Sequence, residues 1–147
     1  MPYRLADWRR LVARLNLARE RTGRFRDAPE AEKDQERHLL DEAVIAIRDT
    51  AEYMINVHLE LRNMRPERRH HASDRARELH ALKLLDEDFS DTLERLERFR
   101  QRAQYGGYVR QPSIHYSSAD VDRCLLVVER LVGATREALK AAGKDVE

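Results

Sequence analysis

A long stripe of apolar residues in the second quarter of the chain constrains the fold more than any other feature. Its members, one histidine included, recur at spacings of three and four: Leu40, Ala43, Val44, Ile47, Ala51, Met54, Ile55, His58 and Leu61. This spacing puts them on one face of an α-helix, and further apolar residues cover other sides of the same stretch. We therefore predict a central helix from about Pro29 or Asp34 to Arg65, ended by Pro66 and roughly 45 Å long.

Three further stretches show the same helical periodicity. Their apolar stripes run from Leu5 to Ala18, from Leu79 to Phe99 and from Val121 to Leu139. The first helix is expected to end near Gly23, because a glycine commonly follows the last turn. The third begins near Asp74. The last begins at Ser117, whose spacing to Asp120 suits a capping box.

An acidic cluster interrupts the third stretch. Asp86, Glu87 and Asp88, followed by Ser90, have side chains that can cap a new helix, so we expect a kink or break near residues 86–90. Four main helices with short connections predict an all-α, up-and-down helical bundle. Charged residues make up 37% of the chain and aromatic residues only 6%, which suits amphipathic helices and disfavours a β-rich fold.

The length of the chain fits one domain. A chain of 147 residues can bury most of the surface that its unfolded form would expose. The polar connector at 23–34 is too short to link two domains, and the tail at 143–147 is expected to fray. We therefore predict a single helical domain over residues 1–147.

The charge balance argues against a general polyanion binder. The chain has 28 Lys and Arg against 27 Asp and Glu, a formal net charge of +1, so no overall basic field surrounds it. The charge is uneven locally, with an acidic block between Asp27 and Glu42 and a basic block between Arg62 and Arg77. Each block is either a solvated face or a surface that steers a partner.

The sequence also bears on the compartment. The single cysteine, Cys124, excludes an intramolecular disulfide and fits a reducing cytosol. The first residues lack the apolar core of a signal peptide, and no apolar run approaches membrane-spanning length. We expect a cytoplasmic protein without membrane contact.

Six histidines raise the question of a metal site. The candidate groups are Glu67 with His70, His70 with His71, and His38 with Glu42. None is accompanied by a cluster of three or four ligands, and the Glu-x-x-His spacing of a di-iron bundle occurs only once. We predict no metal and no cofactor. His58 and Cys124 lie on core stripes, and we expect both to be packed structural side chains.

Arg100 breaks the pattern of the third stretch. It falls near the centre of the stripe that Leu93, Leu96 and Phe99 extend. A charge there must be paired or must open onto a groove, and positions that break a local rule are where function tends to lie. In a purely structural alternative, the arginine packs its stem and reaches solvent with its head, and Gly106–Gly107 only ends the helix.

The sequence around Arg100 is Phe99-Arg100-Gln101-Arg102-Ala103-Gln104-Tyr105-Gly106-Gly107-Tyr108. Entered from a leucine-rich helix and followed by a loop and a capped helix, it resembles the HEPN superfamily of small helical-bundle proteins. One branch, paired with minimal nucleotidyltransferases, shares Phe99 and Arg100, but Gln101 stands where it has asparagine and Tyr105 where it has histidine. A second branch, with Arg-x-x-Ala-Asp-Tyr, fits better through Arg100, Ala103 and Tyr105, while Gln104 replaces its aspartate.

The resemblance implies an all-α homodimer of a toxin–antitoxin or defence-type system, with Arg100 and Tyr105 lining a shared cleft that binds or cleaves RNA. In nuclease members the arginine steadies phosphate charge and a histidine acts as general acid or base. Tyrosine is a poor base at neutral pH, although it can hydrogen-bond a phosphate or stack on a base. The wider set of candidate RNA or phosphate contacts comprises Arg102, Tyr108, Arg110 and His115.

Other assignments stay open at this point. Arg110 and His115 have the spacing of the nuclease motif, but arginines are so frequent that such pairs arise by chance. The chain could instead be a non-catalytic helical module that dimerises or binds a partner protein such as a nucleotidyltransferase or antitoxin. By analogy with the family alone, Tyr105 or Tyr108 would be a target for modification by that partner.

Overall fold

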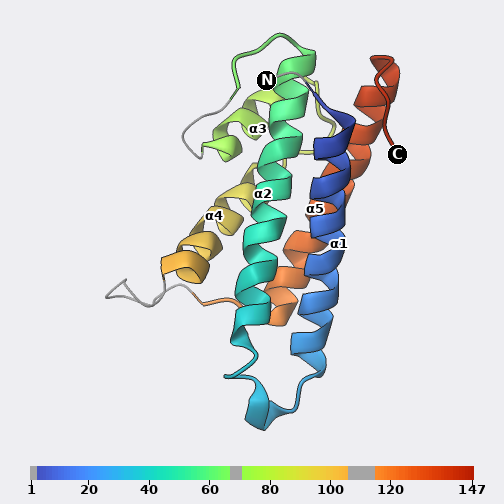
Figure 1. Ribbon diagram of the computed structural model, residues 1–147. Coiled ribbons are helices and arrows are strands. Elements are labelled where there is room, and N and C mark those ends of the chain that lie inside the picture. The colour runs from blue at the N-terminus through green and yellow to red at the C-terminus, as the bar shows by residue number, and fades with distance from the viewer. Residues whose placement is uncertain (1–2, 67–70, 106–114) are drawn as a thin grey trace.

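The computed structural model describes residues 3–66, 71–105 and 115–147. Every regular element in these ranges is helical, which confirms the all-α prediction. The elements are α1 (Leu5–Asp27), the short 3-10 helix η1 (Glu30–Glu32), α2 (Arg37–Leu61), α3 (Ala72–Ala81), α4 (Ser90–Tyr105) and α5 (Ser118–Ala141). In Figure 1, α1, α2 and α5 run side by side, and the shorter α3 and α4 lie along another side of α2.

Helix α2 is the centre of the fold, as its apolar stripe predicted. It packs against α1, α3, α4 and α5, and side chains on several of its faces are buried. The largest of those that are fully buried are Leu40, Ile47, Met54, Ile55 and Leu59. Helix α1 covers one side of α2 with Trp8, Leu11 and Leu15, and ion pairs such as Arg14 with Asp49 (3.2 Å) join the two helices at their edge.

The predicted boundaries of the first two helices were partly wrong. Helix α1 continues past Gly23 to Asp27, so Gly23 lies inside the helix instead of ending it. Helix α2 ends at Leu61, before Arg65 and Pro66. Asn63 ends it in the left-handed conformation (φ 55°), because the amides that follow the helix reach back to its last carbonyl groups.

The third predicted helix is two helices. Lys83 ends α3 in the left-handed conformation (φ 61°), and Asp88 begins α4 by accepting a hydrogen bond from the amide of Ser90 (2.9 Å). The Ser90 hydroxyl, and to a smaller extent this amide, lower the pKa of Asp88. The break at 82–89 is longer than the expected one, and Leu82, placed on the apolar stripe, is 55% exposed.

Helix α5 begins as predicted. The Ser117 hydroxyl accepts a hydrogen bond from the Asp120 amide (3.2 Å), and Asp120 accepts one from the Ser117 amide (2.9 Å), which completes a capping box. Within the tail, the Glu147 carbonyl accepts hydrogen bonds from Trp8 (3.4 Å) and Arg136 (2.9 Å). Within the described ranges, no helix is both long and apolar enough to span a bilayer.

Candidate functional site

The candidate site lies on α4, which delivers Arg100 close to the side of α2. Leu93, Leu96 and Phe99 are buried and hold the helix against its neighbours. Arg100 directly follows Phe99, so the same packing draws it inward, and only 12% of its side chain is exposed. A guanidinium in such a position needs a partner, because desolvating an unpaired charge is costly.

Glu97, one turn earlier on α4, is that partner. Nε of Arg100 donates to both Glu97 carboxylate oxygens (3.0 and 3.2 Å), and Nη2 donates to Oε1 (2.6 Å). Charge-assisted contacts of this forked kind are among the stronger hydrogen bonds in proteins. Of the two outcomes expected for a charge on the apolar stripe, pairing is therefore observed.

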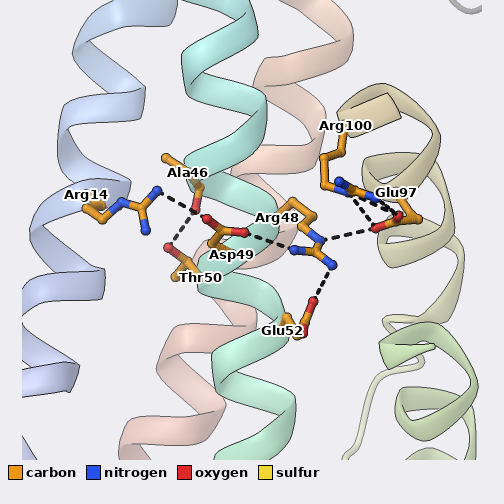
Figure 2. A network of polar contacts seen from close by, with 8 residues as sticks. All are labelled: Arg14, Ala46, Arg48, Asp49, Thr50, Glu52, Glu97 and Arg100. Atoms are coloured by element: carbon orange, nitrogen blue, oxygen red, sulfur yellow. Dashed lines mark hydrogen bonds and ion pairs between the residues drawn. The ribbon is translucent and has the colours of Figure 1, made fainter. Parts of the chain in front are cut away.

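Glu97 also joins α4 to α2. Its Oε2 accepts a hydrogen bond from Nε of Arg48 (3.1 Å). Arg48 is only 8% exposed. Arg48 further pairs with Asp49 (3.0 Å) and Glu52 (2.6 Å) on its own helix. Figure 2 shows these groups converging between α2 and α4, with Arg14 of α1 reaching Asp49 from the other side.

Among the described residues, the network contains as many arginines as carboxylates. Its members are Arg14, Arg48 and Arg100 on one side and Asp49, Glu52 and Glu97 on the other. A partly buried set of ions stays in place only if its members are mutually paired, and the shared hydrogen bonds then favour a single arrangement. The consequence for Arg100 is a fixed orientation near the end of α4, set jointly by two helices.

A second cluster, which sequence reasoning missed, fastens the chain where it enters α5. Tyr116 is buried and donates its phenolic hydrogen to Asp41 of α2. Its ring lies 4.9 Å from that of Phe99, and the guanidinium of Arg37 lies over it at 4.4 Å. Burial and the Asp41 carboxylate raise the pKa of Tyr116 far above its usual range, so it stays a neutral donor.

The remaining predicted residues are placed only in part. Arg102 is half-buried on α4, and Tyr105 is the last residue of that helix, with its side chain outside the described part. Tyr108 and Arg110 also lie outside the described residues. His115 is exposed beside Tyr116. The structure thus joins Arg100 to Glu97 and, through Glu97, to Arg48.

Two other candidates are structural side chains, as predicted. The ring of His58 is buried and lies 3.0 Å from the Thr135 hydroxyl, and burial, with a smaller effect of Arg62, lowers its pKa to about 4. Cys124 is buried, and this burial raises its pKa to about 11. Neither group is poised to react at neutral pH.

The rest of the described surface offers little competing chemistry. No three His, Cys, Asp or Glu residues in the described ranges are placed to share a metal ion. A cavity of about 660 Å³ lies between α1 and α2, lined by residues that include Tyr3, Asp7, Tyr53 and Glu60. It sits where α1 begins and α2 ends, away from the α4 network. The network is the stronger candidate site, because its side chains are partly buried and mutually bonded.

Comparison with known proteins identifies one family. The model of the HEPN domain matches residues 25–138, from the last turn of α1 to near the end of α5, and so includes the whole α4 network except Arg14. No curated protein and no solved structure matches the chain.

Proposed function

The chain belongs to the HEPN domain family, and from this premise we propose that it binds RNA at the C-terminal end of α4. In this proposal two copies form a homodimer, and the ends of their α4 helices line one cleft. Arg100 contacts a phosphate there, and Tyr105 hydrogen-bonds the same phosphate or stacks on a base. We assign the protein to a toxin–antitoxin or defence-type system on the strength of the family alone.

The observation that carries this proposal is the fixed orientation of Arg100. A guanidinium held by Glu97 loses little further conformational freedom when it meets a phosphate, which favours binding. Glu97 also accepts a hydrogen bond from Arg48, so its negative charge is divided between two guanidinium groups and neutralises Arg100 only in part. The planar fork of arginine suits two-point contact with phosphate oxygens.

The same arrangement favours binding over cleavage. The nuclease members of the family use a histidine where this chain has Tyr105. A tyrosine of ordinary pKa, about 10, is protonated at neutral pH and cannot accept a proton efficiently. His115 is the nearest described histidine along the chain, and it is exposed beside Tyr116 rather than paired with Arg100.

Binding and cleavage of labelled single-stranded RNA by the purified protein test the proposal. We expect binding without efficient cleavage, and we expect Arg100→Ala to weaken binding about tenfold, the loss of one charge-assisted contact. Arg19→Ala is the matched control, since Arg19 is an ion-paired arginine on α1. Equal binding by wild type and Arg100→Ala would contradict the proposal. Rapid cleavage that depends on Arg100 would show that the protein is a nuclease and not only an RNA-binding protein.

A second function deserves its own test, because the ion-paired arginines and near-zero net charge also suit a helical module that binds a partner protein. The partner class indicated by the family is a nucleotidyltransferase acting as antitoxin. Co-expression with a candidate from a neighbouring gene, followed by affinity purification, tests it. Recovery of a stoichiometric complex supports this alternative, whereas recovery of the homodimer alone, with tight RNA binding, removes it.

A further inference from the structure

The outer face of α4 carries a row of arginines that is independent of the Arg100 network. Arg95, Arg98 and Arg102 are three and four residues apart, so they share one side of the helix over about 10 Å of its length. Asp91 in the first turn lies on the same side, which leaves the positive charge concentrated toward the end that bears Arg100. We propose that this row binds the backbone of a single-stranded RNA, and that the strand passes round the C-terminal end of α4 to reach Arg100, which faces the opposite side of the helix; this inference rests on the proposed function.

The pairing pattern distinguishes these arginines from most others in the described chain. Within the described residues, Arg95, Arg98 and Arg102 make no hydrogen bond or ion pair. The acidic residues that alternate with them are engaged elsewhere, since Glu94 pairs with Arg77 of α3 (2.8 Å) and Glu97 with Arg48 and Arg100. Glu94 and Glu97 are thus bound to arginines outside the row, and the three arginines of the row keep their charge.

Helix α1 shows the contrast. It is as rich in arginine as α4, but its arginines are mostly tied to carboxylates on other elements. The pairs that leave the helix are Arg9 with Glu147, Arg14 with Asp49, Arg19 with Glu129, Arg21 with Glu42, and Arg26 with Asp122. Three like charges at adjacent helical positions repel one another slightly, so the α4 row is the stronger attractor for an anion.

The chemistry of the face favours RNA over a protein partner. Stable protein interfaces have an apolar centre, but the large apolar side chains exposed in the described residues are Leu17, Leu82 and Leu126, none of them on α4. A line of guanidiniums suits phosphates, and it also stacks on unpaired bases. A single row follows one strand, which is why we infer a single-stranded ligand.

The salt dependence of RNA binding tests the row. Fluorescence anisotropy with a labelled 20-nucleotide polyuridine would compare wild type, the triple variant Arg95→Gln/Arg98→Gln/Arg102→Gln, and the charge-matched control Arg9→Gln/Arg19→Gln/Arg26→Gln. The slope of log K against log salt should become shallower by about 2 in the first variant, at about 0.7 for each lost phosphate contact. The control should keep the wild-type slope.

Each other outcome has a definite meaning. If the α4 variant keeps the wild-type slope while Arg100→Ala still weakens binding, the row does not bind RNA, but the proposed function is still supported. Absence of RNA binding by the wild type overturns both. The row is not a specific RNA-binding surface if the slope falls equally in the two triple variants. The same conclusion follows if polyglutamate of equal charge displaces the RNA. Single Arg→Gln changes, each expected to reduce the slope by about 0.7, provide the test if the triple variant folds poorly by circular dichroism.

Discussion

Glu97 determines the geometry of the candidate site at the scale of single residues. It accepts hydrogen bonds from Arg100 on its own helix and from Arg48 on α2. The first contact follows from the sequence, because residues three apart are neighbours on a helix. The second joins positions far apart in the chain, so no periodicity could have indicated it. The same holds for Tyr116, whose partner Asp41 belongs to another helix.

Glu97→Gln should therefore destabilise the fold by about 1–3 kcal/mol, because it leaves two partly buried guanidiniums without their shared charge. Urea unfolding followed by circular dichroism measures this difference. Glu94→Gln on the same helix is the control, since Glu94 and Arg77 have side chains that are 43% and 50% exposed, and its cost should stay below about 1 kcal/mol. Equal effects would show that the network adds nothing beyond a surface pair.

His58 should make stability depend on pH. Burial lowers its pKa from the ordinary 6.5 to about 4 in the folded protein, so between those values the unfolded chain binds more protons than the folded one. The contribution of His58 to the free energy of unfolding is fully present above pH 6.5. It is lost as the pH falls toward 4, by up to about 3 kcal/mol.

Urea unfolding of wild type and His58→Gln at pH 7, 5.5 and 4.5 measures this contribution as the difference between their pH profiles. His58→Gln is expected to be less stable at pH 7 but to lose less stability on acidification. His38→Gln, at an exposed position, should leave the wild-type profile unchanged. Parallel profiles for wild type and His58→Gln would show that His58 does not carry the effect.

At the scale of elements, apolar spacing predicted the helices well and their ends less well. The stripes located the central α2 and the capped start of α5, and an acidic cluster indicated the break before α4. The ends were misplaced because Asn63 and Lys83, rather than glycine or proline, adopt the left-handed conformation after α2 and α3. Only the returning hydrogen bonds of the folded chain reveal such ends.

Lys83→Gly tests this account of the end of α3. A non-glycine residue in the left-handed region pays a steric cost, partly offset by the extra freedom that glycine has in the unfolded chain. The substitution should stabilise the protein by about 0.5–1 kcal/mol in urea unfolding. Ala81→Gly, inside α3, should have the opposite sign. A destabilising Lys83→Gly would mean that the lysine side chain contributes more than the backbone strain costs.

At the scale of the whole molecule, α1 belongs to the same core as the family domain. The family match begins at residue 25, but Trp8, Leu11 and Leu15 of α1 are buried against the bundle. We propose that residues 1–147 form one folding unit, as expected from the chain length. The distribution of charge follows this architecture, since most arginines of α1 pair with carboxylates elsewhere in the chain whereas Arg95 and Arg98 of α4 are exposed.

Leu15→Ala should accordingly lower the free energy of unfolding of the entire domain by about 2–5 kcal/mol, because it leaves a cavity in the shared core. Leu17→Ala, at a position that is 41% exposed, should cost less than about 1 kcal/mol. Circular dichroism and tryptophan fluorescence, which reports on Trp8, should give one coincident transition. Separate transitions would contradict a single folding unit.

The most direct test of the central claim is a map of where RNA touches the protein. Ultraviolet cross-linking of a 4-thiouridine-labelled single-stranded RNA to the full chain, followed by peptide mass spectrometry, provides that map. We predict cross-links in the second half of α4 and in the segment that leads to Tyr116, and we predict their loss in Arg100→Ala. Cross-links confined to α1, or to the cavity lined by Tyr3 and Tyr53, would contradict the assignment of the RNA site to α4.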